Sequence, residues 1–231
     1  SHMIPTYTGF FREPNIAEFS HSLAPEMARQ LGSCLLIAEV GCSSGQETWS
    51  MSSALLANGV DHHIDAFDTN DEALRQVAGP YDTLKVESLR RIQEDSDYPA
   101  GCLSHFVVSS TVSVESSYKA QIRPSRALQL HASFQRRDII EEPLAPERYH
   151  AAVVNNVLFH YSRTYRNELM QHTVDGLQPG GVLMVEDFSR KRNQDYLLWR
   201  LQMPQQFGLR AIKNSQQDLP TIFTKLPAKS A

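Results

Sequence analysis

The segment Glu39-Val-Gly-Cys-Ser-Ser-Gly45 constrains the fold of this chain more than any other. The apolar residues 34–40 predict a buried strand that leads into it, and residues 46–56 predict a helix that follows it. Glycines in such a loop take positive φ and let the backbone approach a ligand, while the next helix offers free N–H groups. A strand, a glycine loop and a helix in this order predict an α/β protein with a ligand at the loop.

The rest of the chain alternates predicted strands and helices, which favours a parallel sheet covered by helices on both faces. Residues 106–114 and 118–122 break this alternation, because they are rich in valine, serine, threonine and tyrosine and predict a β-hairpin insert. We therefore expect a doubly wound sheet with a first half over 4–94, an insert over 95–135 and a second half over 136–231. Further strands are predicted over 63–67, 149–154, 182–186, 209–212 and 221–224, and further helices from Asp71, Ser162 and Gln194.

Composition excludes several other classes of protein. The chain has 231 residues with 22 basic and 26 acidic side chains, and its net charge of −4 argues against nucleic acid as a partner. Its apolar runs are far shorter than the ~18 residues that cross a membrane. The 3 cysteines follow no disulfide or metal-binding spacing, so we expect a reducing compartment, the cytoplasm, and no metal. Ser1-His2-Met3 has the form of a tag remnant, which places the expected native start at Met3.

Three kinds of site are compatible with the glycine loop alone. A dinucleotide site has the pattern G-x-G-x-x-G, whereas here Cys42 and Ser43 follow Gly41 directly. A hydrolase elbow has the pattern G-x-S-x-G, which the loop matches, but its triad needs a late histidine and none follows His172. The third kind is a nucleoside site for S-adenosylmethionine (SAM), in which the loop passes under the amino-acid part of the cofactor.

Three further features favour the SAM site. Such a site needs an acid at the end of the next strand to bind the ribose hydroxyls, and Asp68 stands there. It needs a polar residue after the third strand for the adenine amine, and Asp138 fits. Residues 177–183 resemble the helix-to-strand turn of class I methyltransferases. Together with the loop, these features predict the doubly wound, Rossmann-like class I methyltransferase fold, with SAM as cofactor and S-adenosylhomocysteine (SAH) as product.

A more specific resemblance covers residues 6–187. The opening Thr6-Tyr-Thr-Gly-Phe-Phe-Arg-Glu13 is similar to the T-x-F-F-R-[ED] segment of the chemotaxis-receptor glutamate O-methyltransferases, the CheR type. The loop from Gly41 to Ser50 is similar to that family's G-C-S-T-G-E-E-P-Y-S, and Val154-Asn-Asn-Val-Leu-Phe-His-Tyr161 is similar to its C-R-N-V-x-I-Y-F. The resemblance implies a sheet with the strand order 3-2-1-4-5-7-6 and a β-hairpin inserted between its second and third strands.

The same resemblance implies roles for individual residues. Thr8 and Arg12 would hold the methionine part of SAM, where Arg12 would grip the carboxylate as a planar fork. Glu47 would lie near the methionine amine, and Asp68 and Asn70 match the acidic segment that follows the second strand. The other implied cofactor-binding residues are Gly41, Cys42 and Gly45 in the loop, Asp138 and Ile139 around the adenine, and Asn155 and Asn156 beside the sulfonium.

Two departures from the family's pattern concern the methyl acceptor. Asn155 stands where the family has an arginine, and His160 stands where it has the tyrosine next to the transferred methyl. A carboxylate acceptor is already ionised at neutral pH, whereas a hydroxyl has a proton that histidine can take. His160 and the adjacent Tyr161 are therefore the candidate catalytic residues. An orienting hydrogen bond and a purely structural role remain alternatives for His160.

The resemblance begins where the chain begins, so the family's preceding helical domain has no counterpart here and we expect a small-molecule acceptor. We predict a SAM-dependent O-methyltransferase that acts on a carboxylate or a hydroxyl of a small molecule. Two alternatives remain: a protein-glutamate carboxyl methyltransferase whose insert recruits a peptide, and a SAM-binding protein without turnover. No nucleic-acid or membrane partner is expected, and the sequence leaves monomer and dimer open.

Overall fold

The computed structural model describes residues 9–83, 86–112, 118–187, 193–212 and 219–229. The strands of its central sheet are β1 (Leu35–Val40), β2 (His62–Asp68), β6 (Ala132–Arg136), β7 (Tyr149–Asn155), β8 (Leu177–Glu186), β9 (Leu209–Ala211) and β10 (Ile222–Lys225). They lie in the order β6-β2-β1-β7-β8-β10-β9. The first five run parallel, and β10 runs antiparallel to β8 and β9. This arrangement confirms the expected strand order.

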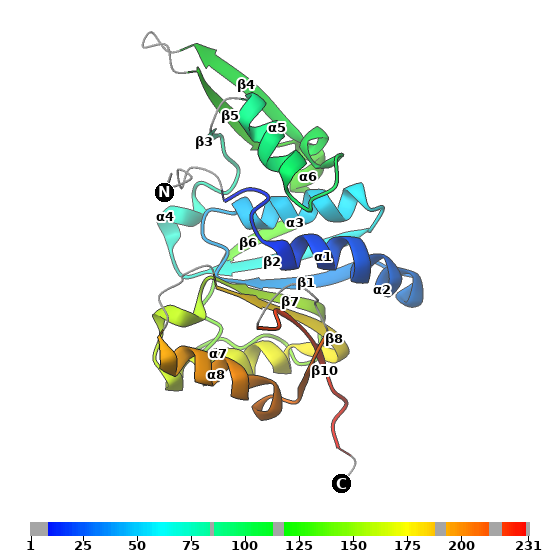
Figure 1. Ribbon diagram of the computed structural model, residues 1–231, viewed down its shortest axis with the longest axis vertical. Helices are drawn as coiled ribbons and strands as arrows, with labels where there is room; N and C mark the ends of the chain where they lie inside the picture. The colour runs from blue at the N-terminus through cyan, green and yellow to red at the C-terminus, as the bar shows by residue number, and fades with distance from the viewer. Residues whose placement is uncertain (1–8, 84–85, 113–117, 188–192, 213–218, 230–231) are drawn as a thin grey trace.

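Helices cover both faces of the sheet (Figure 1). One layer consists of α1 (Pro14–Glu18), the π-helical turn η1 (Phe19–Leu23), α2 (Ala24–Leu31) and α3 (Gln46–Ala57), and the other of α7 (Arg163–Asp175) and α8 (Gln194–Gln206). Side chains of a strand point alternately to its two faces. In β1, Leu35 and Ile37 therefore pack in the core under the first layer, and Ala38 and Val40 in the core under the second. The short helices are α4 (Asp71–Leu74), α5 (Val86–Asp95), η2 (Cys102–His105), α6 (Arg126–Gln129) and η3 (Leu158–His160).

Most predicted elements are present near their expected bounds, with two differences. The helix predicted from Asp71 is the single turn α4. Beyond it the chain continues in turns with shorter-range bonds, in which the amides of Gln76 and Val77 donate to the carbonyls of Ala73 and Leu74. The helices α1, α2 and α5 were not predicted, although the proline at the start of α1 and of α2 is a signal for a helix N-terminus.

A second, smaller sheet contains β3 (Tyr81–Thr83), β4 (Phe106–Val112) and β5 (Tyr118–Pro124), all antiparallel, in the order β3-β5-β4. Its strands β4 and β5 form the predicted hairpin, which projects away from the central sheet (Figure 1). The division of the chain differs from the expected one in two respects. β3 joins the small sheet from the range assigned to the first half, and residues 132–135 of the expected insert belong to β6. A local pattern identifies a strand but not the sheet that it joins.

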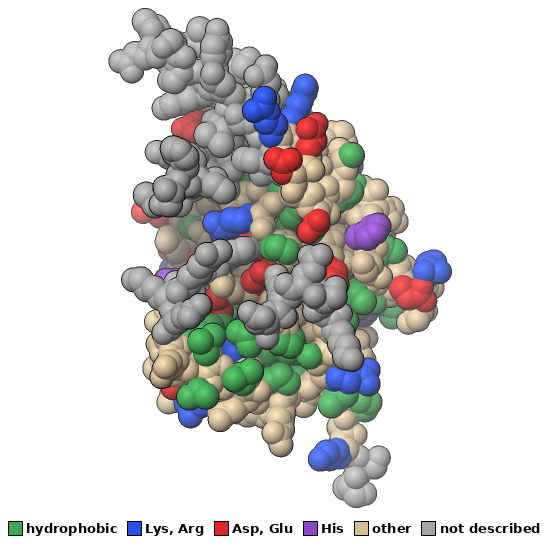
Figure 2. Space-filling view, in the orientation of Figure 1, with side chains coloured by type: hydrophobic (Ala, Val, Ile, Leu, Met, Phe, Trp, Pro, Cys, Tyr) green, Lys and Arg blue, Asp and Glu red, His purple; other side chains and the backbone are tan. Residues whose placement is uncertain are grey.

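The surface carries apolar and charged side chains in different places (Figure 2). Hydrophobic side chains gather in the lower half of the view, where α7 and α8 lie. On α8, Leu198 and Leu201 are 56% and 64% exposed. Over α5, basic and acidic side chains lie next to each other. In the ranges that the structure describes, no helix is both long and apolar enough to span a membrane.

A buried histidine at the start of β2 makes the stability of the fold depend on pH. His62 is 2% exposed, its Nε2 lies 2.7 Å from Oγ of Ser52, and its ring stacks on His131 at 4.9 Å. Burial lowers the pKa of His62 to about 4. The unfolded chain, in which a histidine titrates near 6.5, therefore binds a proton that the folded chain excludes. The contribution of neutral His62 to the free energy of unfolding is fully present above about pH 6.5. It falls as the pH drops toward about 4.

We expect the free energy of unfolding to fall by about 2 kcal/mol between about pH 7.5 and about pH 5 through His62 alone. Urea denaturation at both pH values measures it. His62→Asn is the matched variant, because asparagine keeps a polar group near Ser52 and has no proton to gain. The variant should be less stable at the higher pH but should lose less on acidification, and equal losses in both proteins would contradict this role.

Candidate functional site

The glycine loop joins the carboxyl end of β1 to α3. Its backbone is left-handed at Gly41 and Gly45, where φ is +79° and +94°. A Cβ atom on Gly41 would lie 2.4 Å from Cγ2 of Val157, so a larger residue does not fit without a shift. The amide groups of Gly41 and Cys42 both donate to the carbonyl of Phe67, at 2.8 and 3.0 Å. These contacts fix the loop between the ends of β2 and β7.

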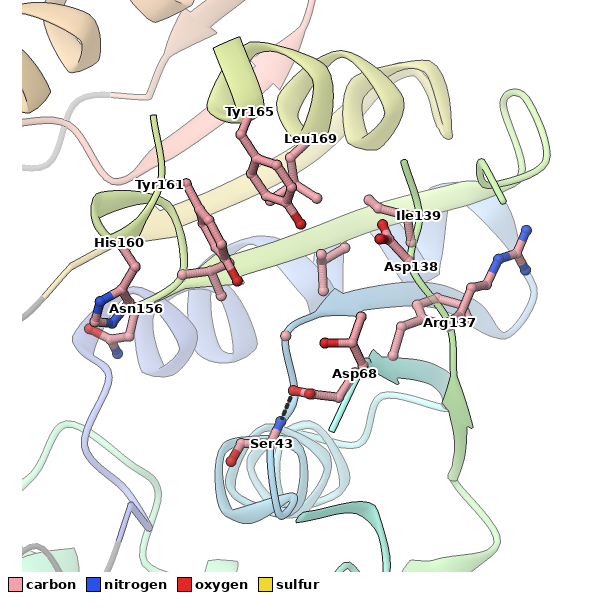
Figure 3. A pocket seen from close by; sticks show the side chains of 15 residues that line it. Ser43, Asp68, Arg137, Asp138, Ile139, Asn156, His160, Tyr161, Tyr165 and Leu169 are labelled. Atoms are coloured by element: carbon pink, nitrogen blue, oxygen red, sulfur yellow. Dashed lines mark hydrogen bonds between the residues drawn. The ribbon is translucent and has the colours of Figure 1, made fainter. Parts of the chain in front are cut away.

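Two adjoining cavities open beside this loop. The first cavity measures about 220 Å³, the second about 280 Å³, and they share a wall of Gly41, Ser43 and Asn156. The first cavity, drawn in Figure 3, is also lined by Val40, Phe67, Asp68, Thr69, Arg137, Asp138, Ile139, Val157, His160, Tyr161, Tyr165 and Leu169. The second is also lined by Gly9, Arg12, Glu13, Cys42, Ser44, Gln46, Glu47 and Asn155.

Most residues that the sequence singled out therefore lie around one of the two cavities. Gly45 lines neither, but its left-handed backbone turns the chain from the loop into α3. Asn70 also lines neither, and its Oδ1 caps α4 by accepting from the amides of Glu72 and Ala73. Thr8 lies outside the described residues, as does the expected tag remnant.

Asp68 stands at the end of β2 and faces the first cavity (Figure 3). Its Oδ2 accepts from the amide of Ser43 at 2.7 Å, and its Oδ1 accepts from the amide of Asn70 at 2.8 Å. Each carboxylate oxygen has a second lone pair. Asp68 is thus able to accept hydrogen bonds from two hydroxyl groups of a ligand while it holds the loop.

One end of the first cavity combines an apolar slot with a carboxylate. Phe67 and Ile139 are buried there, and the guanidinium of Arg137 lies 5.5 Å from the centroid of the Phe67 ring. Asp138 accepts from the amide of Ile140 at 2.9 Å. Apolar walls with a polar group at the edge suit a flat heterocycle that carries an amine.

The second cavity gathers carboxylates around one arginine. Nε of Arg12 lies 3.1 Å from Oε1 of Glu13, and the Arg12 side chain is 49% exposed whereas that of Glu13 is 1% exposed. Asn155 is buried, pairs with the amide of Asn15 at 3.1 Å, and places its Nδ2 3.4 Å from Oε2 of Glu47. The amide pair therefore helps to hold the Glu47 carboxylate in place.

Burial makes the carboxyl groups beneath this cavity weak acids. Burial raises the pKa of Glu39 to about 7, and burial together with Glu13 and Glu39 raises the pKa of Glu47 well above its ordinary value. Burial also raises the pKa of Glu13, although Arg12 opposes the rise. In the described part of the chain, both oxygens of Glu39 and Oε2 of Glu13 are buried without a hydrogen-bond partner. Because buried unpaired carboxylates are costly, the cluster favours a ligand with positive charge.

Asn156 occupies the shared wall in a strained backbone conformation. Its φ is +57°, a value that costs most residues free energy and that asparagine tolerates better than most. Its amide donates to the carbonyl of Glu186 at 2.7 Å, and its Nδ2 lies 3.5 Å from Oε1 of Glu13. The Asn156 side chain is thereby placed where the two cavities meet.

Aromatic side chains from η3 and α7 stand at the mouth of the first cavity. His160 lines this cavity together with Asn156, and in Figure 3 the hydroxyl of Tyr161 points toward the cavity. Both side chains are exposed, and the Tyr161 ring stacks on Tyr165 at 4.2 Å. An imidazole and a phenol are thus available to a second molecule that approaches the shared wall.

Some of the lining residues were not identified from the sequence. Tyr165 and Leu169 were assigned to one face of a predicted helix, but their face could not be related to a cavity before the helix was placed. Glu13 belongs to the opening segment that resembles the family, but it was assigned no role of its own, and neither was Glu39, which lies beneath the second cavity. Among the residues that the structure describes, no group of three or more histidine, cysteine, aspartate or glutamate side chains is arranged to hold a metal ion.

The contact of Gly41 with Val157 leads to a stability prediction. Gly41→Ala introduces both a left-handed alanine and an overlap, and should lower the free energy of unfolding by about 3 kcal/mol. Gly59→Ala is the control, since Gly59 has φ +73° and nothing within 4 Å, and should cost about 1 kcal/mol. Urea denaturation compares them. The additional Val157→Ala substitution should recover part of the loss in Gly41→Ala, and equal costs at the two glycines would contradict the overlap.

A family model and several solved structures are similar to this chain. A family model described as the SAM-binding domain of CheR methyltransferase matches residues 6–196. No curated protein matches the sequence. Among solved structures, a putative SAM-dependent methyltransferase of Methanococcus maripaludis is 12% identical, with 94% of this chain and 93% of that chain covered and a TM-score of 0.47. The methyltransferase domain of bacterial CtHen1-C is 11% identical, with 93% and 98% covered and a TM-score of 0.47.

The [4+2]-cyclase SpnF is also similar, at 14% identity and a TM-score of 0.43, with 74% of this chain covered. This chain spans 42% of the length of SpnF. The family model, in contrast, extends over most of this chain, from the residues before α1 into α8. The protein therefore belongs to the CheR methyltransferase family and is a SAM-dependent methyltransferase.

Proposed function

We propose that the protein transfers the methyl group of SAM to an oxygen of a small-molecule hydroxyl or carboxylate, with His160 and Tyr161 on the acceptor side. The observation that carries this proposal is that His160 and Tyr161 line the first cavity together with Asn156, which also belongs to the wall shared with the second cavity (Figure 3). A methyl group at that wall would lie within reach of a second molecule that enters past the exposed imidazole.

The residues of the two cavities fit SAM. In the first cavity, Asp68 would bind the ribose hydroxyls, and Asp138 and Ile139 would frame the adenine. In the second, Arg12 would bind the methionine carboxylate and Glu47 the ammonium group. The buried oxygens of Glu13 and Glu39 that lack hydrogen-bond partners support this placement, because the ammonium and sulfonium groups would add positive charge near them. SAM supplies the activated methyl group, and the protein residues orient the reaction partners.

The residues near the shared wall favour a hydroxyl over a carboxylate as the acceptor. Most of the charged groups around the second cavity are acidic, and the buried Asn155 adds no positive charge where the family pattern has arginine. A carboxylate acceptor would therefore lack the cationic partner that the family pattern places at this position. A hydroxyl acceptor carries no charge, and the imidazole of His160 is suited to accept its proton as the new bond forms.

Transfer requires the acceptor oxygen to lie in line with the bond that breaks, at roughly 3–3.5 Å from the methyl carbon. The left-handed Asn156 and the close contact of Gly41 with Val157 keep the wall behind the methyl rigid. Tyr161, held by its stacking on Tyr165, would orient the acceptor from the opposite side. Positioning by these groups, with proton removal by His160, accounts for the proposed reaction.

A second candidate is methyl transfer to a glutamate side chain of a protein, which membership of the CheR family favours. This acceptor needs no base, so His160 would orient the carboxylate instead of removing a proton. A third candidate is SAM binding without turnover, which the departures at Asn155 and His160 favour.

The test uses SAM with a radiolabelled methyl group and a panel of small phenols, alcohols, carboxylic acids and glutamate-containing peptides. We expect label in small hydroxylated compounds, and a loss of roughly 100-fold in turnover for His160→Phe, the scale of a lost general base. His160→Gln keeps a hydrogen bond but cannot remove a proton, so it should lose turnover to a similar degree. Affinity for SAH, measured by calorimetry, should stay unchanged in both variants.

The other outcomes identify the rival functions. Label in peptides alone would support the protein-glutamate candidate, and tight SAH binding without label anywhere would support binding without turnover. Full turnover in His160→Phe would remove His160 from the mechanism. A folded protein that binds no SAH would contradict the assignment of the cavities.

The carboxyl cluster also predicts how cofactor affinity depends on pH. Glu39, with its pKa raised by burial to about 7, is mostly protonated in the free protein below that pH. A cationic ligand favours the ionised form, so SAM affinity should increase by roughly tenfold from about pH 6 to about pH 8 for one released proton. Calorimetry in buffers of different ionisation enthalpy measures both affinity and proton release. Glu39→Gln should show a flatter dependence, and an unchanged slope would contradict the role of Glu39.

A further inference from the structure

The small sheet and its flanking helices contact the residues of the second cavity through an aromatic cluster. Phe10 packs edge-on against Tyr81 of β3 at 5.3 Å and against Phe106 of β4 at 5.6 Å. Phe11 packs edge-on against Tyr98 at 5.4 Å and against Phe106 at 5.9 Å. All five rings are buried. The segment that carries Arg12 and Glu13 is therefore anchored to residues outside the central sheet.

Tyr81 connects the small sheet to the glycine loop. Its hydroxyl lies within hydrogen-bond distance of two carbonyls, those of Ser44 in the loop and of Val77. A Cβ atom on Gly45 would lie 3.3 Å from this hydroxyl, so the glycine leaves room for it. Trp49 donates to the same carbonyl of Val77 at 2.7 Å. Tyr81 of the small sheet thus holds Ser44, the residue that directly follows Ser43 of the shared wall.

Tyr98 makes the corresponding connection to the other segment. This residue follows α5, is 4% exposed, and donates its hydroxyl to the carbonyl of Glu13 at 3.0 Å. Gln93 of α5 donates to the carbonyl of Tyr98 at 3.2 Å, which fixes the tyrosine in turn. Two buried hydroxyls from outside the central sheet therefore each hold a main-chain carbonyl of the second cavity.

We propose that Tyr81 and Tyr98 are positioning residues through which the small sheet sets the geometry of the methionine end of the cofactor site. This inference rests on the proposed placement of the methionine part of SAM in the second cavity. Neither tyrosine lines the first or the second cavity, so each acts through a main-chain segment: Tyr81 through Ser44, and Tyr98 through Glu13. Without the hydroxyl, the segment has more conformations in the free protein, and binding must order it.

The coupling between the small sheet and the cofactor site acts in both directions. If the small sheet helps to bind the cofactor, the bound cofactor stabilises the small sheet by the same factor. Cofactor binding should therefore slow amide hydrogen exchange in β4 and β5, which line neither cavity. A partner that binds the small sheet would change cofactor affinity by the same route.

The test measures SAH affinity by calorimetry and amide hydrogen exchange by mass spectrometry in the full chain. Tyr81→Phe removes the hydroxyl and keeps the packed ring, and should weaken SAH binding by roughly fivefold to tenfold, the scale of one lost hydrogen bond. It should also reduce the protection that SAH gives to β4 and β5. Tyr98→Phe should have the same two effects through Glu13, and provides a second test if Tyr81→Phe does not fold.

Tyr149→Phe is the matched control. Tyr149 is also buried, and its hydroxyl donates to Oδ2 of Asp65 at 2.7 Å, but it stands at the opposite end of the central sheet from the cavities. It should lower the melting temperature without weakening SAH binding. Unchanged SAH affinity in both folded tyrosine variants, or an equal loss in Tyr149→Phe, would overturn the inference. Wild-type protein that binds SAH without protecting β4 and β5 would overturn the coupling alone, whereas wild-type protein that binds no SAH would overturn the cofactor site as well.

Discussion

The close approach of Gly41 to Val157 is the contact on which the geometry of the site depends. It brings the end of β1 against the segment that follows β7, at a distance where even one additional carbon atom on Gly41 would overlap with a side chain. The first segment carries the loop under the cofactor, and the second carries Asn156 and His160. Residues of both segments line the cavities, and Gly41 and Asn156 belong to the shared wall. The hydrogen bonds from Gly41 and Cys42 to Phe67 extend the same contact to β2 and Asp68.

The charge of the site follows from where the strands end. Glu39 is near the end of β1, Asn155 ends β7 and Glu186 ends β8, and all are buried at the carboxyl edge of the sheet. A carboxylate in that position loses its hydration, and the nearby groups replace only part of it. The protein tolerates this cost at one end of the sheet, where a ligand with two cationic groups would relieve it. At the opposite end, buried His62 is neutral for the same physical reason.

The sequence predicted the fold well because its signals were local and repeated. The strand before Gly41, the acid at the end of β2 and the start of α7, where the Ser162 side chain accepts from the amide of Tyr165, each depend on a few neighbouring residues. The strand order came from the family resemblance, and the sheet confirms it. The site was predicted less completely. The roles of Glu13, Asn15 and Tyr81 depend on contacts between residues distant in the chain, such as the pairing of Asn15 with Asn155, and no local pattern reveals such contacts. Asn70 illustrates the converse, since a position that matches a family motif also caps a helix here.

The strained backbone of Asn156 has a consequence for how such enzymes diverge. A left-handed residue that also bonds Glu186 and approaches Glu13 admits few replacements, and changes there disturb both cavities at once. His160 lies only four residues later, yet its side chain is exposed on a single helical turn. Substitutions at His160 can therefore change the side chain that faces the acceptor without disturbing the backbone at Asn156. Relatives with new substrates should differ first at the position of His160 and last at that of Asn156.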